Sequence, residues 1–473
     1  MVFSSAVFLF VFFPLTLILY FMVGRSGDEE KDIAKKNLIL CLASLIFYAW
    51  GEPVYIVLMC LSIFFNYHLG LDMESHRNSS RKMKALLIFG VCFNLFMLGF
   101  FKYAGFIVSN LNSLFGTAIE FEGLPLPVGI SFYTFQILSY VIDVYRGQVR
   151  AQTKIVSFAA YISMFPQLIA GPIVQYSDIE KQLSHRTVTI DNFYEGIIYF
   201  IRGLGKKVLF ANTIGAVYSD IISQGIGNTS VVTAWICIIC YTLQIYFDFS
   251  GYSDMAVGLG KMFGFEFVQN FNFPYKAVSI TDFWRRWHIS LSSWFRDYVY
   301  IPLGGNRKGT LRTIFNIFVV WSLTGLWHGA AWNFIAWGMF YGVLLILEKY
   351  VLKNILERVP VIFRHIGTLI VVMIGWVFFS SENMTQATDF IGALIGFGNG
   401  SFIDSQAMYL LSENAFPIFA MGLSAVGVFE MTSTREETRV YKALKCLAYL
   451  VIFILCITFL VSETYNPFLY FRF

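Results

Sequence analysis

Long apolar runs recur along almost the whole chain, and they constrain its fold more than any other feature. The first extends from Ala6 to Val23 without a charged residue. An α-helix needs about 20 apolar residues to cross a bilayer. By this measure, membrane helices are predicted near 2–24, 37–50, 53–71, 85–108, 126–145, 155–171, 193–222, 231–260, 311–327, 330–350, 362–380, 415–430 and 442–462. Several of these segments are short or polar, so the predicted count is roughly ten to thirteen.

The composition excludes an ordinary soluble protein. Of the 473 residues, 57% are hydrophobic and only 14% are charged, whereas soluble domains carry about 25% charged residues. The net charge of +4 is too small to indicate a nucleic-acid-binding protein. We therefore predict an all-α polytopic membrane protein that contacts membrane lipid and no nucleic acid.

In the first third of the chain, basic residues are concentrated in alternate loops. Loops 25–36, 74–84 and 146–154 each carry three or more Lys or Arg, whereas Gly51–Pro53 and Ser109–Pro127 carry none. Cytoplasmic loops are enriched in Lys and Arg. The pattern thus predicts that the basic loops are cytoplasmic and that the N-terminus is outside. The first apolar run lacks the basic n-region and cleavage site of a signal peptide, so we interpret it as a membrane helix.

Polar residues interrupt the apolar runs mainly in the middle of the chain. Pro166 breaks one run, Gly203–Lys207 another, and Asp248 and Asp254 a third. Such residues are tolerated at membrane depth only where protein or a water-filled cavity surrounds them. We expect the two acids to pair with buried arginines or to cap broken helices; ion coupling in a transporter is the alternative.

These interruptions predict the domain organisation. The chain is expected to form one domain, 1–473, whose core at about 146–335 surrounds a central funnel or tunnel. Segments 1–145 and 336–473 are expected to form a peripheral scaffold. The seven cysteines lie in apolar runs, and none has zinc-ligand spacing to a histidine. We therefore predict no disulfide and no metal site.

Two histidines lie in the most unusual stretch of the chain, Phe283 to Trp332. His288 and His328 are forty residues apart, each among tryptophans and small or polar residues. An ionisable side chain at membrane depth is costly and indicates a functional site. A neutral imidazole can take a proton from a hydroxyl. We predict that His328 is a catalytic base and His288 a second catalytic residue; a buried structural histidine is the alternative.

The surroundings of His288 are both basic and aromatic. The pattern Ser279-x-x-Asp282 predicts a helix start, and Trp284, His288 and Phe295 would share one face of that helix. Residues 276–312 carry seven Lys or Arg against two acids. This excess indicates either contact with anionic lipid or a mouth for a phosphate-bearing thioester. The predicted donor-binding or tunnel residues are Trp284, Arg285, Arg286, Trp287, Trp294, Arg296, Trp327, Trp332 and Asn333.

The chain ends in the aromatic sequence NPFLYFRF. One interpretation is an anchor at the membrane interface. The alternatives are that Tyr470 reaches into the core and acts as a covalent relay for a transferred group, or that the tail contacts an external partner.

The central motifs resemble those of a known family. The segments WRRWHISLSSWFRDYVYIPLGGNR and GLWHGAAWNFIAWG resemble the signature of membrane-bound O-acyltransferases. The segments MFPQLIAGPIVQY, YFDFSGYSDMAVGLG, NFNFPYKAVSITDFWRRWH and NPFLYFRF are similar to its alginate O-acetyltransferase-like branch. The resemblance spans nearly the whole chain. The related branch that transfers D-alanine to teichoic acids shares the two-histidine core.

The resemblance implies the fold of that family and an enzyme of the bacterial inner membrane. It places the invariant histidine of the family at His328 and its second signature position at His288. It also implies that acetyl groups pass from a cytoplasmic donor, expected to be acetyl-CoA, to an extracellular or cell-wall polysaccharide such as alginate. No bound cofactor is expected, and an SGNH-type acetyltransferase is the expected external partner.

Two other functions remain as alternatives. One is transfer of D-alanyl or another acyl group to a cell-envelope polymer. The other is a transporter without chemistry, which would predict inverted repeats. The sequence shows no such symmetry.

Overall fold

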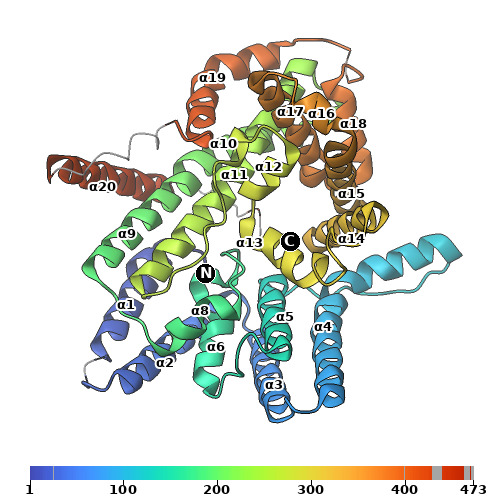
Figure 1. The fold of residues 1–473 in the computed structure, drawn as a ribbon. Coiled ribbons are helices and arrows are strands. Elements are labelled where there is room, and N and C mark those ends of the chain that lie inside the picture. The colour runs from blue at the N-terminus through green and yellow to red at the C-terminus, as the bar shows by residue number, and fades with distance from the viewer. Residues whose placement is uncertain (25, 399, 429–438, 463–468, 470–473) are drawn as a thin grey trace. The chain divides into compact units, whose positions relative to one another are not determined.

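The computed structural model describes the chain except residues 25, 399, 429–438, 463–468 and 470–473 (Figure 1). Every regular element in the described part is a helix, which confirms the predicted all-α class. Among the described residues, seven helices are long and apolar enough to cross a membrane: Glu29–Gly51, Ile56–Ser75, Ser80–Phe115, Val231–Met262, Trp332–Leu356, Val361–Ser380 and Val440–Ser462. The number of spans predicted from the sequence is larger because that prediction also includes shorter or more polar helices.

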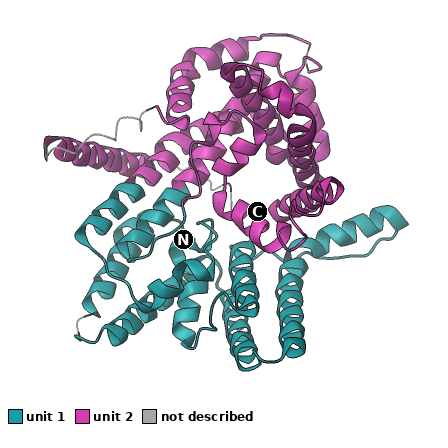
Figure 2. Cartoon of the chain, viewed as in Figure 1, with its two compact units in different colours: residues 1–200, 252–268, 472 teal, residues 201–251, 269–471, 473 magenta. Residues whose placement is uncertain are grey.

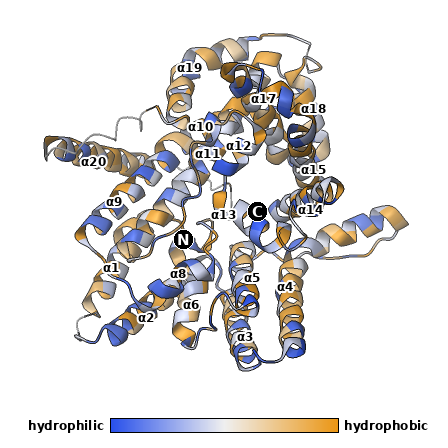
Figure 3. Ribbon diagram, viewed as in Figure 1, coloured by the Kyte–Doolittle hydropathy of each residue, from blue (hydrophilic) through white to orange (hydrophobic). Residues whose placement is uncertain are grey.

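In Figure 3, hydrophobic residues extend along α4 and α20, and hydrophilic residues gather where α3 and α4 join.

The described chain divides into two compact units (Figure 2). Unit 1 contains residues 1–200 and 252–268, and unit 2 contains residues 201–251 and 269–471. Helices α9 (Ile190–Gly205) and α11 (Val231–Met262) contribute residues to both units. The core expected at 146–335 includes residues of both units and stays a prediction.

Unit 1 is built from paired helices. Helix α2 packs against α6, and α3, α4 and α5 pack against one another (Figure 1). Helix α2 begins after Asp28, whose carboxylate caps it by accepting a 3.2 Å hydrogen bond from the Lys31 N–H. The elements of unit 1 are η1 (Phe8–Phe12), α1 (Phe13–Met22), α2 (Glu29–Gly51), α3 (Ile56–Ser75), α4 (Ser80–Phe115), α5 (Ile130–Arg146), α6 (Ile155–Ser163), α7 (Phe165–Leu168) and α8 (Tyr176–Ser184). The predicted break at Pro166 is confirmed by the gap between α6 and α7.

The three basic loops meet at one end of unit 1. Arg77, after α3, donates a hydrogen bond of 2.8 Å to the carbonyl oxygen of Val149 in the loop after α5. Lys154, in the same loop, forms a 2.5 Å ion pair with Glu30 at the start of α2. The segments predicted to share one side of the membrane therefore lie together.

The loops without Lys or Arg meet at the other end of α3. The N–H of Val128 donates to Glu52 Oε1 over 3.2 Å, which joins the loop before α5 to the loop before α3. The backbone nitrogen of Met1 lies beside Gly51. Within unit 1, the N-terminus is thus at the end opposite the basic loops.

Unit 2 contains a close helical hairpin, α14 and α15. A Cβ atom at Gly325 would collide with the carbonyl oxygen of Phe334, and one at Gly338 would collide with that of Trp321. The predicted close approach at the small residues around His328 is therefore present. Helix α17 packs against α15 and α18 (Figure 1). The elements of unit 2 are η2 (Lys206–Ala211), α10 (Asn212–Ser223), η3 (Ile226–Asn228), η4 (Pro274–Lys276), α12 (Ile280–Arg286), α13 (Ile289–Phe295), η5 (Arg296–Tyr300), α14 (Thr310–His328), α15 (Trp332–Leu347), η6 (Glu348–Leu352), α16 (Lys353–Leu356), α17 (Val361–Ser380), α18 (Met384–Leu394), α19 (Ser405–Ala425) and α20 (Arg439–Ser462).

The polar residues of α9 and α11 do not break these helices, so the helices predicted near 193–222 and 231–260 are confirmed, and the alternative of capped broken helices is wrong at these residues. Helix α11 continues through Asp248 and Asp254, and α9 continues through the π-helical segment η2 into α10. In unit 2, Asp248 instead forms a 2.7 Å ion pair with Lys207, and the two side chains are only 2% and 4% exposed. Pairing neutralises both charges, so neither helix has to unwind for water. Asp248 is therefore paired, as expected, but its partner is a lysine and not the predicted arginine.

Candidate active site

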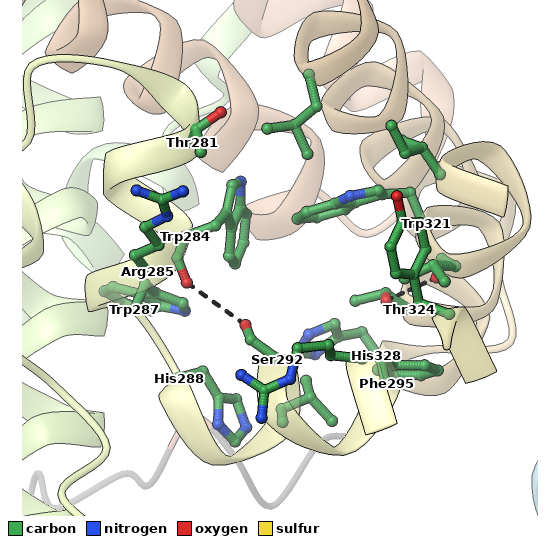
Figure 4. A pocket seen from close by; sticks show the side chains of 16 residues that line it. Thr281, Trp284, Arg285, Trp287, His288, Ser292, Phe295, Trp321, Thr324 and His328 are labelled. Atoms are coloured by element: carbon green, nitrogen blue, oxygen red, sulfur yellow. Dashed lines mark hydrogen bonds between the residues drawn. The ribbon is translucent and has the colours of Figure 1, made fainter. Parts of the chain in front are cut away.

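A cavity in unit 2 brings the two predicted catalytic histidines into one wall (Figure 4). Its volume is about 260 Å³, and most of its wall comes from α12, α13 and α14. The lining residues are Thr281, Trp284, Arg285, Trp287, His288, Leu291, Ser292, Phe295, Arg296, Tyr300, Ile317, Val320, Trp321, Thr324, His328 and Leu345. The lining is mostly apolar and aromatic, with few polar groups, as is usual for a small-molecule site.

The chain bends sharply at His288. The predicted continuous helix is wrong, because α12 ends at Arg286 and α13 begins at Ile289. His288 has φ 45° and ψ 55°, in the left-handed region that residues other than glycine rarely adopt. Such strain persists only where the surroundings enforce it. The bend still leaves Trp284, His288 and Phe295 on the same cavity.

Two caps fix the start of α12. The predicted cap is confirmed, since Ser279 Oγ accepts a 3.1 Å hydrogen bond from the Asp282 N–H. In addition, the Glu348 carboxylate at the start of η6 accepts hydrogen bonds from the N–H groups of Ile280 and Thr281, at 2.7 and 3.1 Å. Because η6 continues α15, these hydrogen bonds attach the start of α12 to the end of α15.

The hydrogen bonds of His288 define its tautomer. Its Nδ1 lies 3.2 Å from Asn270 Oδ1. The N–H and Oγ of Ser290 approach the same oxygen at 3.2 and 2.9 Å. A backbone N–H can only donate, so this Asn270 atom is the carbonyl oxygen, and Nδ1 of His288 must carry a proton. Nε2 is buried and has no hydrogen-bond partner among the described residues.

The ring of His288 is also uncharged. It is 1% exposed, and burial lowers its pKa to about 3. A neutral ring with its proton on Nδ1 has a lone pair on Nε2. His288 can therefore accept a proton or hydrogen bond at Nε2, but it has no second N–H to donate.

His328 is the last residue of α14 and is 3% exposed. Its ring meets those of Trp337 and Phe379 edge to face, with centroids 5.0 Å apart in each pair. The Trp327 ring is 4.9 Å from the His328 ring and 6.0 Å from that of His288. An aromatic side chain thus neighbours both imidazoles.

The three predicted arginines have different environments. Arg285 and Arg296 are exposed and line the cavity. Arg296 is paired with Asp297 at 2.8 Å, whereas Arg285 forms no ion pair within the described part of the chain. Arg286 forms a 2.8 Å ion pair with Asp282 and does not line the cavity. An anionic group could contact Arg285 without breaking an existing pair.

The remaining predicted residues do not all reach the cavity. Trp284 and Trp287 line it, whereas Trp294 is buried beside Tyr298, with ring centroids 5.2 Å apart. Trp332 is 58% exposed and does not line it. The Asn333 amide donates hydrogen bonds of 3.2 and 2.8 Å to the carbonyl oxygens of Phe378 and Ser381. Asn333 thus joins α15 to the end of α17.

Part of the lining was not predicted from the sequence. Helix α14 contributes Ile317, Val320, Trp321 and Thr324 together with His328. These positions lie three or four residues apart on the same face of α14 as His328. Their helical periodicity could therefore have identified them from the sequence. Asn270 lies 18 residues before His288 in sequence, and no local pattern connects the two.

The tail is described only at one position near its end. The N–H of Leu469 donates a 2.9 Å hydrogen bond to Asp248 Oδ2, the carboxylate paired with Lys207. Tyr470 lies outside the described residues, so its relay role stays a prediction. Among the residues described, no three His, Cys, Asp or Glu side chains converge as metal ligands would.

Comparisons with known proteins agree with the resemblance. The model of the membrane-bound O-acyltransferase family matches residues 52–387. A Pseudomonas aeruginosa protein described as a probable alginate O-acetylase AlgI is 45% identical over 84% of this chain and 75% of its own length. A Pseudomonas putida protein of the same description is 39% identical over 100% of both chains. A Helicobacter pylori peptidoglycan O-acetyltransferase is 35% identical over 84% of this chain and 80% of its own. The chain therefore belongs to the membrane-bound O-acyltransferase family.

Proposed function

We propose that this enzyme passes acetyl groups from cytoplasmic acetyl-CoA across the membrane for O-acetylation of an extracellular or cell-wall polysaccharide such as alginate. The observation that carries the proposal is the placement of His288 and His328 on one small apolar cavity bordered by Arg285. The acceptor is supported by the similarity to a probable alginate O-acetylase and a peptidoglycan O-acetyltransferase.

The chemistry requires a base and a donor for the developing oxyanion. In the proposed step, the acceptor hydroxyl gives its proton to His328 as its oxygen bonds to the acetyl carbon. The C–S bond then breaks, and the leaving thiolate takes the proton from the imidazolium. The Trp284 side chain lines the cavity, and its indole N–H is buried and has no hydrogen-bond partner among the described residues. It is the proposed oxyanion donor, since the Nδ1–H of His288 is used by Asn270.

We place the enzyme in the bacterial inner membrane with its N-terminus outside. The clustering of basic loops at one end of unit 1 supports this orientation, because Lys and Arg are enriched on the cytoplasmic side. Single cysteines at Ser79 and Gly123, in a variant without the native cysteines, test it. Cytoplasmic labelling at residue 79 and external labelling at residue 123 are expected; the opposite result would overturn the orientation.

The tail and an SGNH-type external acetyltransferase are proposed to act after the first transfer. The hydrogen bond from Leu469 to buried Asp248 supports a role of the tail at the core of unit 2 instead of an aromatic anchor at the membrane interface. Deletion of residues 470–473 is expected to abolish acetylation while the protein stays folded. Under the anchor interpretation, the deletion would leave acetylation unchanged, and Tyr470→Phe then separates a relay hydroxyl from an aromatic contact.

Inside-out membrane vesicles containing the enzyme, its SGNH-type partner and polysaccharide provide the test of the proposed donor. Radiolabelled acetyl-CoA outside such vesicles should label the enclosed polysaccharide, and right-side-out vesicles should not. Label from a D-alanyl donor alone would favour the D-alanyl alternative. Movement of intact donor without acyl transfer would favour a transporter.

A further inference from the structure

We infer that Asn270 is a positioning residue that fixes the tautomer of His288, so that Nε2 acts as a hydrogen-bond acceptor toward the substrate. The inference rests on the proposed function and deepens it. It assigns His288 to placing an O–H or N–H group of the substrate, and it excludes His288 as an oxyanion donor.

Asn270 is tied to the bend at several points. Its backbone carbonyl accepts a 3.0 Å hydrogen bond from the N–H of Ile289, directly after His288. Its side-chain oxygen accepts from Ser290 and from His288 itself. One residue thus holds both the strained backbone and the ring, and all three side chains are at most 3% exposed.

The other neighbours of His288 do not compete for Nδ1. The rings of Phe249 and Trp327 lie 4.7 and 6.0 Å from it. The titratable groups that share its cavity are His328, Arg285, Arg296 and Tyr300. Asp248 immediately precedes Phe249 but is paired with Lys207. Burial is the sole cause that lowers the pKa of His288. A change in this pKa after substitution of Asn270 can therefore be assigned to Asn270 and not to a neighbouring charge.

Substitution of Asn270 should change both tautomer and titration. Asn270→Ala removes the acceptor, so the proton can occupy either ring nitrogen. Asn270→Asp keeps the acceptor and adds a negative charge, which raises the pKa of His288 by about 1–3 units. A higher pKa means that more of the ring is protonated at a given pH, and a protonated Nε2 can no longer accept.

Nitrogen NMR of ¹⁵N-histidine-labelled protein measures the tautomer directly. The signals absent from His288→Ala identify His288. Wild type should show a protonated Nδ1 and a bare Nε2 at pH 7, and Asn270→Ala should show exchange between tautomers. A protonated Nε2 in wild type, or an unchanged tautomer in Asn270→Ala, would overturn the inference even if no transfer activity were found.

The pH profile of acetyl transfer provides the functional test. Relative to wild type, Asn270→Asp should lose up to about tenfold more transfer between pH 8 and pH 5. Asn94→Ala is the matched control. Asn94 is a buried asparagine of α4 that is hydrogen-bonded to Asn66 within unit 1. Superimposable profiles of Asn270→Asp and wild type would contradict the inference, whereas absence of transfer in wild type would contradict only the proposed function.

Discussion

Burial determines the charge state of His288 and, with it, the pH dependence expected of the enzyme. Burial removes the water that would solvate an imidazolium, so the pKa of this ring falls to about 3. A group with a lowered pKa stays neutral as pH falls, until the pH approaches that lowered value. His288 should therefore contribute no loss of activity between pH 8 and pH 5. A transfer profile with an acid limb near pH 6.5 that disappears in a His288 variant would contradict this.

The indole of Trp284 gives a second prediction at this scale. Trp284→Phe retains most of the ring but removes the buried N–H. Loss of one oxyanion donor typically lowers kcat about 10²- to 10³-fold, and a loss of this order is expected with little change in the KM for acetyl-CoA. Trp50→Phe, at an exposed tryptophan of α2, is the control. Wild-type kcat in Trp284→Phe would exclude this group as the oxyanion donor.

At the scale of elements, the hairpin of α14 and α15 holds His328 in place through contacts that leave no room for side chains. A methyl group at Gly338 would collide with the backbone of Trp321. Overpacking of this kind costs about 1–3 kcal/mol, so Gly338→Ala should lower the Tm in detergent. Gly367→Ala in α17 is the matched control, because no atom lies within 4 Å of its added methyl. Its higher helix propensity should leave stability equal or slightly higher. Equal Tm changes in the two variants would contradict the close packing.

The ion pair between η2 and α11 gives another prediction at this scale. Removal of one member of a buried pair leaves an uncompensated charge and costs about 3–5 kcal/mol. Asp248→Asn should therefore lower stability strongly, and Lys207→Met combined with Asp248→Leu should recover much of the loss. Glu195→Gln disrupts the exposed pair with Lys261 and should cost at most about 1 kcal/mol. Thermal unfolding of the detergent-solubilised variants measures these differences.

For the whole molecule, apolar runs and loop charges were sufficient to predict an all-helical membrane protein and most of its helices. They could not predict the partner that stabilises Asp248 within α11, because Lys207 is distant from it in sequence. Nor could they predict the bend at His288, since Asn270 acts from a separate loop. The residues predicted around the two histidines were partly brought together. Two predicted residues do not line the cavity: the Trp332 side chain is exposed, and Arg286 forms an ion pair with Asp282.

The central claim is that acetyl transfer occurs at the cavity and depends on His328. The most direct test supplies radiolabelled acetyl-CoA to vesicles containing wild type, His328→Ala or His68→Ala, and follows label into polysaccharide. His68 is an exposed histidine of α3 and serves as the control. Wild type and His68→Ala should transfer label equally, and His328→Ala should lose at least about 100-fold while remaining folded. Transfer by His328→Ala at the wild-type rate would contradict the account.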